Sequence, residues 1–95
     1  MKINDNTRNE LARHGLKILK RAVLDVLYQE AKEGGIVNVE TICKKLPILP
    51  TKNSGYTNSL IIGVLSHLQG DGDAEYVRYE KAGRMTKKGR SVIEN

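Results

Sequence analysis

Apolar residues recur at steps of three and four along three separate stretches of the chain. This spacing predicts three amphipathic helices that bury one stripe each in a common core. The members of the three stripes are, in turn, Leu16, Leu19, Val23, Val26 and Leu27; Val39, Ile42, Cys43 and Leu46; and Leu60, Ile61, Val64, Leu65 and Leu68. We expect the first helix to end at Gly34-Gly35, the second at Pro47 and the third within residues 70–73.

Polar residues before the stripes predict where the helices begin. Thr7 and Glu10 have the spacing of a capping box, so a helix begins there, and Gly15 either breaks it or only weakens it. We therefore divide the chain into residues 1–15, an N-terminal arm or short helix, and residues 16–95, one folded domain. Asn38 is the expected N-cap of the second helix. Residues 51–55 form a polar connector, and position 57 or 58 caps the third helix.

The hydrophobic period changes after the third helix. Residues 74–79 are rich in strand formers, and residues 81–83 predict a turn with Gly83 at its positive-φ position. Arg84-Met85 returns as a second strand, and Thr86 caps a last short helix. Residues 36–37 are too short to assign by pattern and are compatible with a brief strand. The predicted order is helix, short strand, helix, helix, strand, turn, strand, short helix, an α+β class that is mainly α.

This order resembles the winged helix-turn-helix family, and three local features carry the resemblance. Residues 58–68 are similar to the third helix of such domains, and residues 74–85 resemble the hairpin called the wing. Thr86-Lys87-Lys88-Gly89 matches a T-x-x-G pattern that often follows the wing in bacterial and archaeal regulators. The likeness covers residues 16–93. It implies a three-helix core with a small β-hairpin wing.

The resemblance also implies a function, which is binding of duplex DNA by a transcriptional regulator. In this family the third helix enters the major groove and the wing lies on the backbone or minor groove. A homodimer is expected, because one small domain reads few base pairs. The implied DNA-binding residues are Lys52, Asn53, Ser54, Tyr56, Thr57, Asn58, Ser59, Arg78, Lys81, Arg84, Lys87 and Lys88.

Each group of these residues also has a simpler interpretation. The polar residues before and within the third helix are equally typical of a solvated capping loop. Arg78, Lys81 and Arg84 suit phosphate contacts, but they also fit a charged hairpin that stays soluble. Lys87 and Lys88 either extend the basic surface or belong to a solvated helix face.

Composition agrees with a polyanionic partner but favours it only mildly. The 95 residues include 16 basic and 11 acidic ones, a net charge of +5. The single cysteine, Cys43, lies on an apolar stripe, which predicts a buried thiol. With one cysteine and two histidines we expect no disulfide within the chain, no metal and no cofactor. The absence of a signal-like or membrane-spanning apolar run predicts a cytoplasmic protein.

A second function remains open, because the predicted third helix has no lysine or arginine between Thr57 and Gly70. Its outer side would carry Ile62 and Gly63, which suit a protein partner better than a phosphate-lined groove. The alternative is therefore a winged-helix protein-interaction module. Catalysis is not expected, since no nucleophile with a base, no paired carboxylates in a suitable setting and no phosphate-binding glycine motif occurs.

Overall fold

A computed structural model describes the backbone of residues 5–31, 34–46 and 54–95, and the side chains of residues 15–31, 34–46 and 58–95. The elements follow the predicted order and are mainly helical. They are α1 (Asp5–Ala31), β1 (Ile36–Asn38), α2 (Val39–Lys45), α3 (Ser54–Asp71), β2 (Ala74–Val77), the 3₁₀ turn η1 (Arg78–Glu80), β3 (Ala82–Met85) and α4 (Lys87–Glu94).

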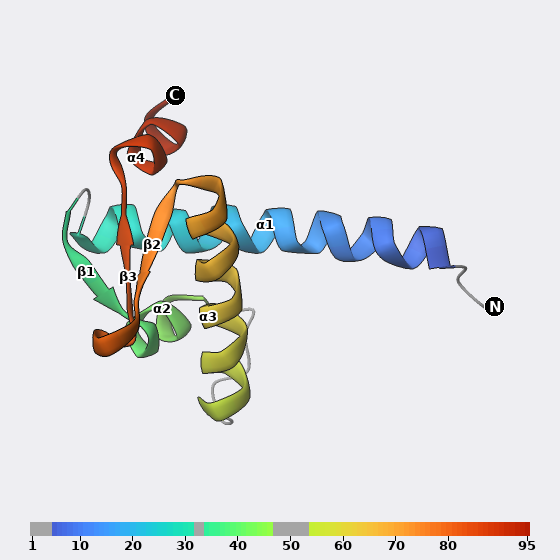
Figure 1. Ribbon diagram of the computed structural model, residues 1–95, viewed down its shortest axis with the longest axis horizontal. Coiled ribbons are helices and arrows are strands. Elements are labelled where there is room, and N and C mark those ends of the chain that lie inside the picture. Colours follow the sequence, from blue (N-terminus) through green and yellow to red (C-terminus); the bar gives the residue numbers. More distant parts are fainter. Residues whose placement is uncertain (1–4, 32–33, 47–53) are drawn as a thin grey trace.

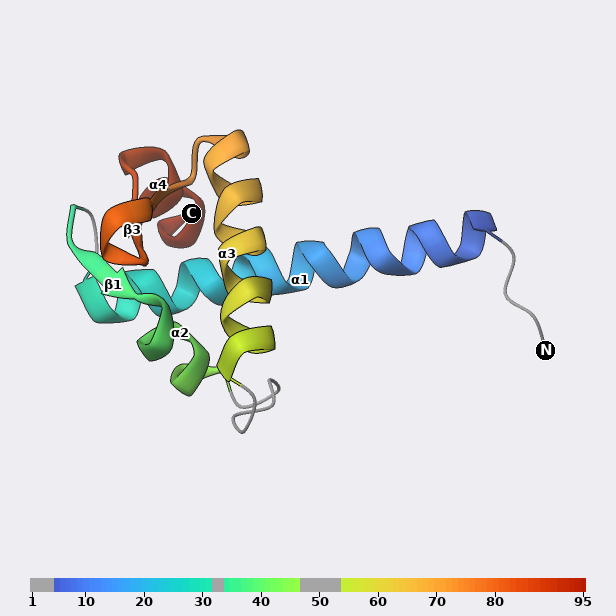
Figure 2. The ribbon, with the colours of Figure 1, turned by 60° about the horizontal axis from the view of Figure 1, so that its bottom comes forward.

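Helix α1 is continuous and longer than the stripe alone predicts. It spans 27 residues and runs through Gly15, so the glycine does not break it. Its C-terminal half packs against the other elements, while its N-terminal half projects beyond them (Figures 1 and 2). Gly34, with φ of +89°, follows the helix in the left-handed conformation that was expected there.

The three strands form one antiparallel sheet in the order β1-β3-β2. The brief strand β1, which the pattern left open, pairs with β3 across more than forty positions of sequence, and Val37 lies opposite Gly83. On the other side β2 pairs with β3, and Tyr76 lies opposite the same glycine. Strand β3 is therefore the centre of the sheet.

The predicted turn at residues 81–83 is wrong in detail. The chain reverses over Arg78–Lys81, and the positive φ belongs to Lys81 rather than Gly83. Gly83 lies within β3 and is buried. A side chain does not fit there, because a Cβ would come within 2.7 Å of Leu65 Cδ2. The glycine thus permits close packing instead of a turn. Arg78 and Tyr79, which the sequence placed in the strand, accordingly lie in the turn after β2 has ended at Val77.

The start of α3 also differs from the expectation. The helix begins at Ser54, before the predicted caps at positions 57 and 58, so the end of the predicted connector is helical. The start of α2 is as predicted: the side-chain oxygen of Asn38 accepts a hydrogen bond from the backbone N–H of Glu40 at 2.7 Å. Helix α3 ends at Asp71, and Gly72 follows with φ of +82°.

A single apolar core lies between α1, α2, α3 and the sheet. Helix α3 crosses α1 in both views, and the sheet covers the end of α1 that lies opposite the projecting half (Figures 1 and 2). Most of the predicted stripe residues are buried; Cys43, Leu60, Leu16 and Leu19 are only partly so. The largest fully buried side chains are Leu27, Ile42, Ile61, Leu65, Leu68, Met85, Val23 and Val64.

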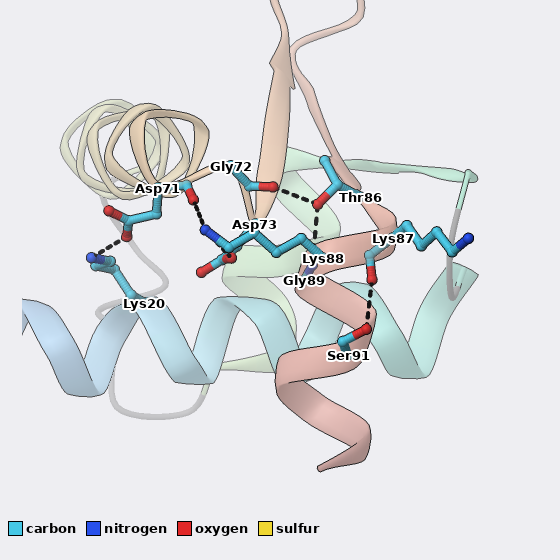
Figure 3. A network of polar contacts seen from close by, with 9 residues as sticks. All are labelled: Lys20, Asp71, Gly72, Asp73, Thr86, Lys87, Lys88, Gly89 and Ser91. Carbon is cyan, nitrogen blue, oxygen red and sulfur yellow. Dashed lines mark hydrogen bonds and ion pairs between the residues drawn. The ribbon is translucent and has the colours of Figure 1, made fainter.

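The Thr86-Lys87-Lys88-Gly89 segment joins α4 to the end of α3 (Figure 3). The Thr86 hydroxyl donates to the Gly72 carbonyl at 2.6 Å and accepts the backbone N–H of Gly89 at 3.1 Å, so it caps α4 as predicted. The backbone N–H of Thr86 donates to the Asp73 carbonyl. A Cβ on Gly89 would lie 1.9 Å from that carbonyl oxygen, so only glycine fits.

We predict that Gly89→Ala lowers the free energy of unfolding by at least about 2 kcal/mol, because a rigid backbone carbonyl must move to admit the methyl group. The matched control is Gly63→Ala in α3, where no atom beyond the adjacent residues and the helix's own nearby backbone lies within 4 Å of the new methyl group. That control should gain about 0.5–1 kcal/mol from helix propensity. Urea unfolding followed by circular dichroism measures both values. Equal effects of the two substitutions would contradict the packing of α4.

Asp71 at the end of α3 is tied to α1 through Lys20 (Figure 3). The hydrogen bond from Lys20 is the main cause that lowers the pKa of the Asp71 carboxyl from its usual value of 3.8. A carboxylate with a lowered folded-state pKa stabilises the fold above its unfolded pKa, and that contribution disappears as the pH falls through the folded value. The contact is exposed, so its contribution is small.

Asp71→Asn should therefore flatten the acid limb of the stability profile. The wild-type protein is expected to lose free energy of unfolding more steeply than the variant as the pH drops below about 4, where the unfolded carboxyl takes up a proton. Urea unfolding at a series of pH values from neutral to acid checks this. Parallel profiles for the two proteins would show that the Lys20–Asp71 pair contributes nothing.

Candidate nucleic-acid interface

One end of the molecule gathers the start of α2, the N-terminal part of α3 and the hairpin turn. In Figure 1 all three lie at the bottom of the view, opposite α4. They border a groove of about 400 Å³. The described residues that line it are Asn38, Val39, Glu40, Asn58, Ser59, Ile62, Tyr79, Glu80 and Lys81.

The hairpin turn is held against α2 by its backbone. The carbonyl of Lys81 accepts the N–H of Val39 at 2.9 Å, and the N–H of Lys81 donates to the Arg78 carbonyl at 3.3 Å. Lys81 itself has φ of 47° and ψ of 56°, a left-handed conformation that glycine or asparagine adopts more cheaply. Lysine at this position therefore keeps a positive charge in the turn at the cost of backbone strain, whereas glycine would relieve the strain and remove the charge.

Tyr79 is the most exposed large hydrophobic side chain among the described residues, at 99%. It stands in the turn between Arg78 and Lys81, and it lines the groove. An exposed aromatic ring between two cations is suited to stacking on a base or sugar, or to a protein contact. Sequence reasoning treated Tyr79 as a strand residue and missed it. The sequence did contain a signal for this turn: Tyr79 is followed by Glu80 and Lys81, so the alternation of polar and apolar residues that is typical of a strand stops there.

The cations predicted on the hairpin are not equivalent. Arg78 and Lys81 are exposed, and neither has a side-chain hydrogen bond or ion pair with the residues that the structure describes. Arg84, in contrast, lies directly across from Glu75 in the sheet and donates to its carboxylate at 2.6 Å. Its charge is largely compensated there. Two of the three hairpin cations are thus available at the groove end.

Lys87 and Lys88 lie at the opposite end of the hairpin, on α4 (Figure 1). The Lys88 ammonium donates to the Asp71 carbonyl at 2.5 Å and lies 3.9 Å from the Asp73 carboxylate. Lys87 points away from this network (Figure 3). The structure therefore separates these two lysines from the start of α3 and from Arg78 and Lys81, although Arg78 and Lys88 lie within eleven positions of sequence.

The predicted helix residues can be followed only in part. Lys52 and Asn53 lie outside the described residues, and the backbone of Ser54, Tyr56 and Thr57 forms the beginning of α3. Asn58 and Ser59 both line the groove.

The Asn58 side chain already has a partner on α2. Its amide oxygen accepts the Cys43 thiol at 3.4 Å. Bidentate recognition of adenine uses both the oxygen and the nitrogen of an asparagine amide. Asn58 must give up this weak bond to make that contact.

Cys43 is half-buried beside Asn58, where a buried core thiol was predicted. Burial raises the pKa of the Cys43 thiol, so it stays protonated at neutral pH and is a poor nucleophile. Among the described residues, no group of three histidine, cysteine or carboxylate side chains is arranged to hold a metal ion. The chemistry available at this end of the molecule is hydrogen bonding, stacking and charge.

Carboxylates also border the groove. Glu40 lies in the first turn of α2 and Glu80 in the hairpin turn, and each is exposed. The positive charges of Lys81 and Arg78 therefore lie near the two negative carboxylates of Glu40 and Glu80. A polyanion approaching this end must orient so that its phosphates meet the turn and avoid the start of α2.

Comparison of the chain with protein-family models, curated proteins and solved structures finds no match in any of the three. The functional assignment accordingly depends on the residues of this chain. Within the part that the structure describes, no helix is both long and apolar enough to cross a lipid bilayer.

We predict that Lys81→Gly raises the free energy of unfolding by up to about 1 kcal/mol, because glycine adopts the left-handed conformation without strain. Lys81→Ala removes the same charge but keeps the strained backbone, so it should not be stabilised. Thermal or urea unfolding of the two variants separates these effects. Equal stabilities would mean that the backbone at Lys81 carries no strain.

Proposed function

We propose that the protein binds duplex DNA as a winged helix-turn-helix regulator. The N-terminal part of α3 enters the major groove, and the turn Arg78–Lys81 lies on the neighbouring phosphate backbone or minor groove. The observation that carries the proposal is the common groove: Asn58 and Ser59 of α3 border the same hollow as Tyr79 and Lys81 of the turn. A helix and a hairpin turn that share one face can contact adjacent grooves of one duplex.

The electrostatics of this end support the proposal in two ways. Arg78 and Lys81 are exposed and uncompensated by the described side chains, which suits phosphate contacts. Helix α3 begins at this same end, and the N–H groups of a helix start attract a phosphate even where the helix itself lacks cations. The net charge of +5 adds a general attraction to nucleic acid.

The proposal predicts salt-dependent binding that depends on the turn. Fluorescence anisotropy with a random-sequence duplex should show an affinity that falls steeply between about 50 and about 200 mM salt. Arg78→Ala combined with Lys81→Ala should weaken binding at least about tenfold at low salt and reduce the log–log salt slope by about 2, one unit for each lost phosphate contact.

Lys87→Ala combined with Lys88→Ala is the charge-matched control, since it removes the same two charges from the other end of the hairpin. This control should change the affinity and the salt slope much less. An equal loss in the two double variants would mean that only net charge attracts DNA, and the docking geometry would be wrong. Absence of binding to the duplex even at low salt would overturn the DNA-binding proposal itself.

A protein-interaction module is the second candidate, and the carboxylates of the groove favour it. Glu40 and Glu80 line the groove together with the half-buried Ile62 and the exposed Tyr79. A hollow that combines apolar side chains with charges of both signs is typical of a surface that binds a protein segment. In this case Tyr79→Ala would abolish partner binding, whereas added salt would weaken it only slightly.

A further inference from the structure

The side-chain amide of Asn58 on α3 is oriented by a contact with α2. Its oxygen, Oδ1, accepts a hydrogen bond from the Cys43 thiol at 3.4 Å, and both side chains are half-buried. The amide nitrogen, Nδ2, has no partner among the residues that the structure describes. One end of the amide is therefore bonded to α2, and the other end, which carries two N–H donors, is free.

The orientation of this amide is a property of the folded protein. Burial raises the pKa of the Cys43 thiol, so the S–H donor is present at neutral pH. An amide turned by half a rotation would place Nδ2 against the sulfur, which is a weak acceptor, and would lose the S–H···O bond. The positions of the two helices are set by the core, because Ile42 beside Cys43 and Ile61 three residues after Asn58 are both fully buried.

The free end of the amide is the one that a ligand in the groove can use. Asn58 lines the groove, whereas Cys43 is not among the described residues that line it. The oxygen is thus turned toward a residue outside the groove. Nδ2 lies on the other side of the amide carbon, and it is the polar atom of Asn58 that has no bond to break before it binds a ligand.

The four DNA bases differ in what they offer to such a donor. In the major groove guanine and thymine carry a carbonyl oxygen, O6 or O4, where adenine and cytosine carry an amino group. An amide N–H2 pairs with the carbonyl oxygen of these keto bases. Bidentate recognition of adenine requires the amide oxygen as well, and in Asn58 that oxygen is bonded to Cys43.

We propose that Cys43 is a positioning residue that makes Asn58 select a keto base, guanine or thymine, in place of adenine. The inference rests on the proposed function, because it places the start of α3 in the major groove. Cys43 does not touch the DNA and acts only through the orientation of the Asn58 amide. Asn58 then supplies base selection, while the cations of the hairpin turn supply affinity that is independent of sequence.

Selection from a library of random-sequence duplexes at low salt, with sequencing of the bound fraction, tests the proposal on the full chain. Asn58→Ala identifies the base pair that Asn58 contacts, because preference should be lost there alone. At that base pair the wild-type protein should bind guanine or thymine at least about tenfold more tightly than adenine. Cys43→Ala frees the amide to turn, so the preference should move to adenine.

Cys43→Ser is the matched control, since it keeps a donor of similar size and should retain the wild-type preference. Adenine preference in the wild-type protein, an unchanged preference in Cys43→Ala, or the same change in Cys43→Ser and Cys43→Ala would overturn the proposal. The last result would mean that the packing of the sulfur matters and its proton does not.

A second measurement without DNA separates this proposal from the proposed function. In the ¹H–¹⁵N spectrum, the side-chain amide resonances of Asn58 should move in Cys43→Ala and much less in Cys43→Ser. Equal movement in the two variants would overturn the positioning role even if DNA is bound. Absence of binding to any duplex would overturn the proposed function and base selection with it, while the spectrum still shows whether the thiol orients the amide.

Discussion

The close packing of β3 against the helices is the contact on which the rest of the structure depends. Gly83 presses its backbone onto Leu65 of α3, and a built Cβ would also come within 3.2 Å of Leu27 of α1. Since β3 pairs with both β1 and β2, this one contact positions the whole sheet on the crossed helices. The hairpin turn then reaches the start of α2 and α3, where the Lys81 carbonyl accepts the N–H of Val39. The groove is a consequence of that packing.

The threonine-glycine segment after the hairpin is explained by backbone geometry alone. Thr86 connects the end of α3 to the start of α4, and Gly89 is required because the Asp73 carbonyl occupies the place of a Cβ. Neither residue lies at the groove. A motif that resembles a family of DNA-binding proteins therefore reports on how the last helix is attached, and it carries no information about what the opposite end of the hairpin binds.

The order of elements and the core could be predicted from the sequence, because each stripe repeats at the helical period and glycines, Pro47 or capping side chains mark most helix ends. Asn38 and Thr86 cap their helices as expected. The conformation of the turn could not be predicted in this way. Glycine adopts a positive φ at the lowest cost, so the sequence predicted that Gly83 would do so. In the structure Gly83 is needed instead for close packing against Leu65, and Lys81 has the strained positive φ. Contacts between residues that are distant in sequence thus determine which of Gly83 and Lys81 has the positive φ.

The positions of the basic residues in the structure could not be predicted from their proximity in the sequence either, and these positions bear on function. From Arg78 to Lys88 the sequence looks like one basic cluster, but a short antiparallel hairpin places its turn and its far end at opposite ends of the molecule. Arg84 is compensated by Glu75, and Lys88 by the end of α3, while Lys87 lies on α4 at the far end of the hairpin. Arg78 and Lys81 remain in the turn, where Lys81 and Tyr79 line the groove. Two cations and one ring form a small contact surface. Tight binding of a nucleic acid at this surface would therefore require further contacts from the start of α3, or two copies of the protein acting together.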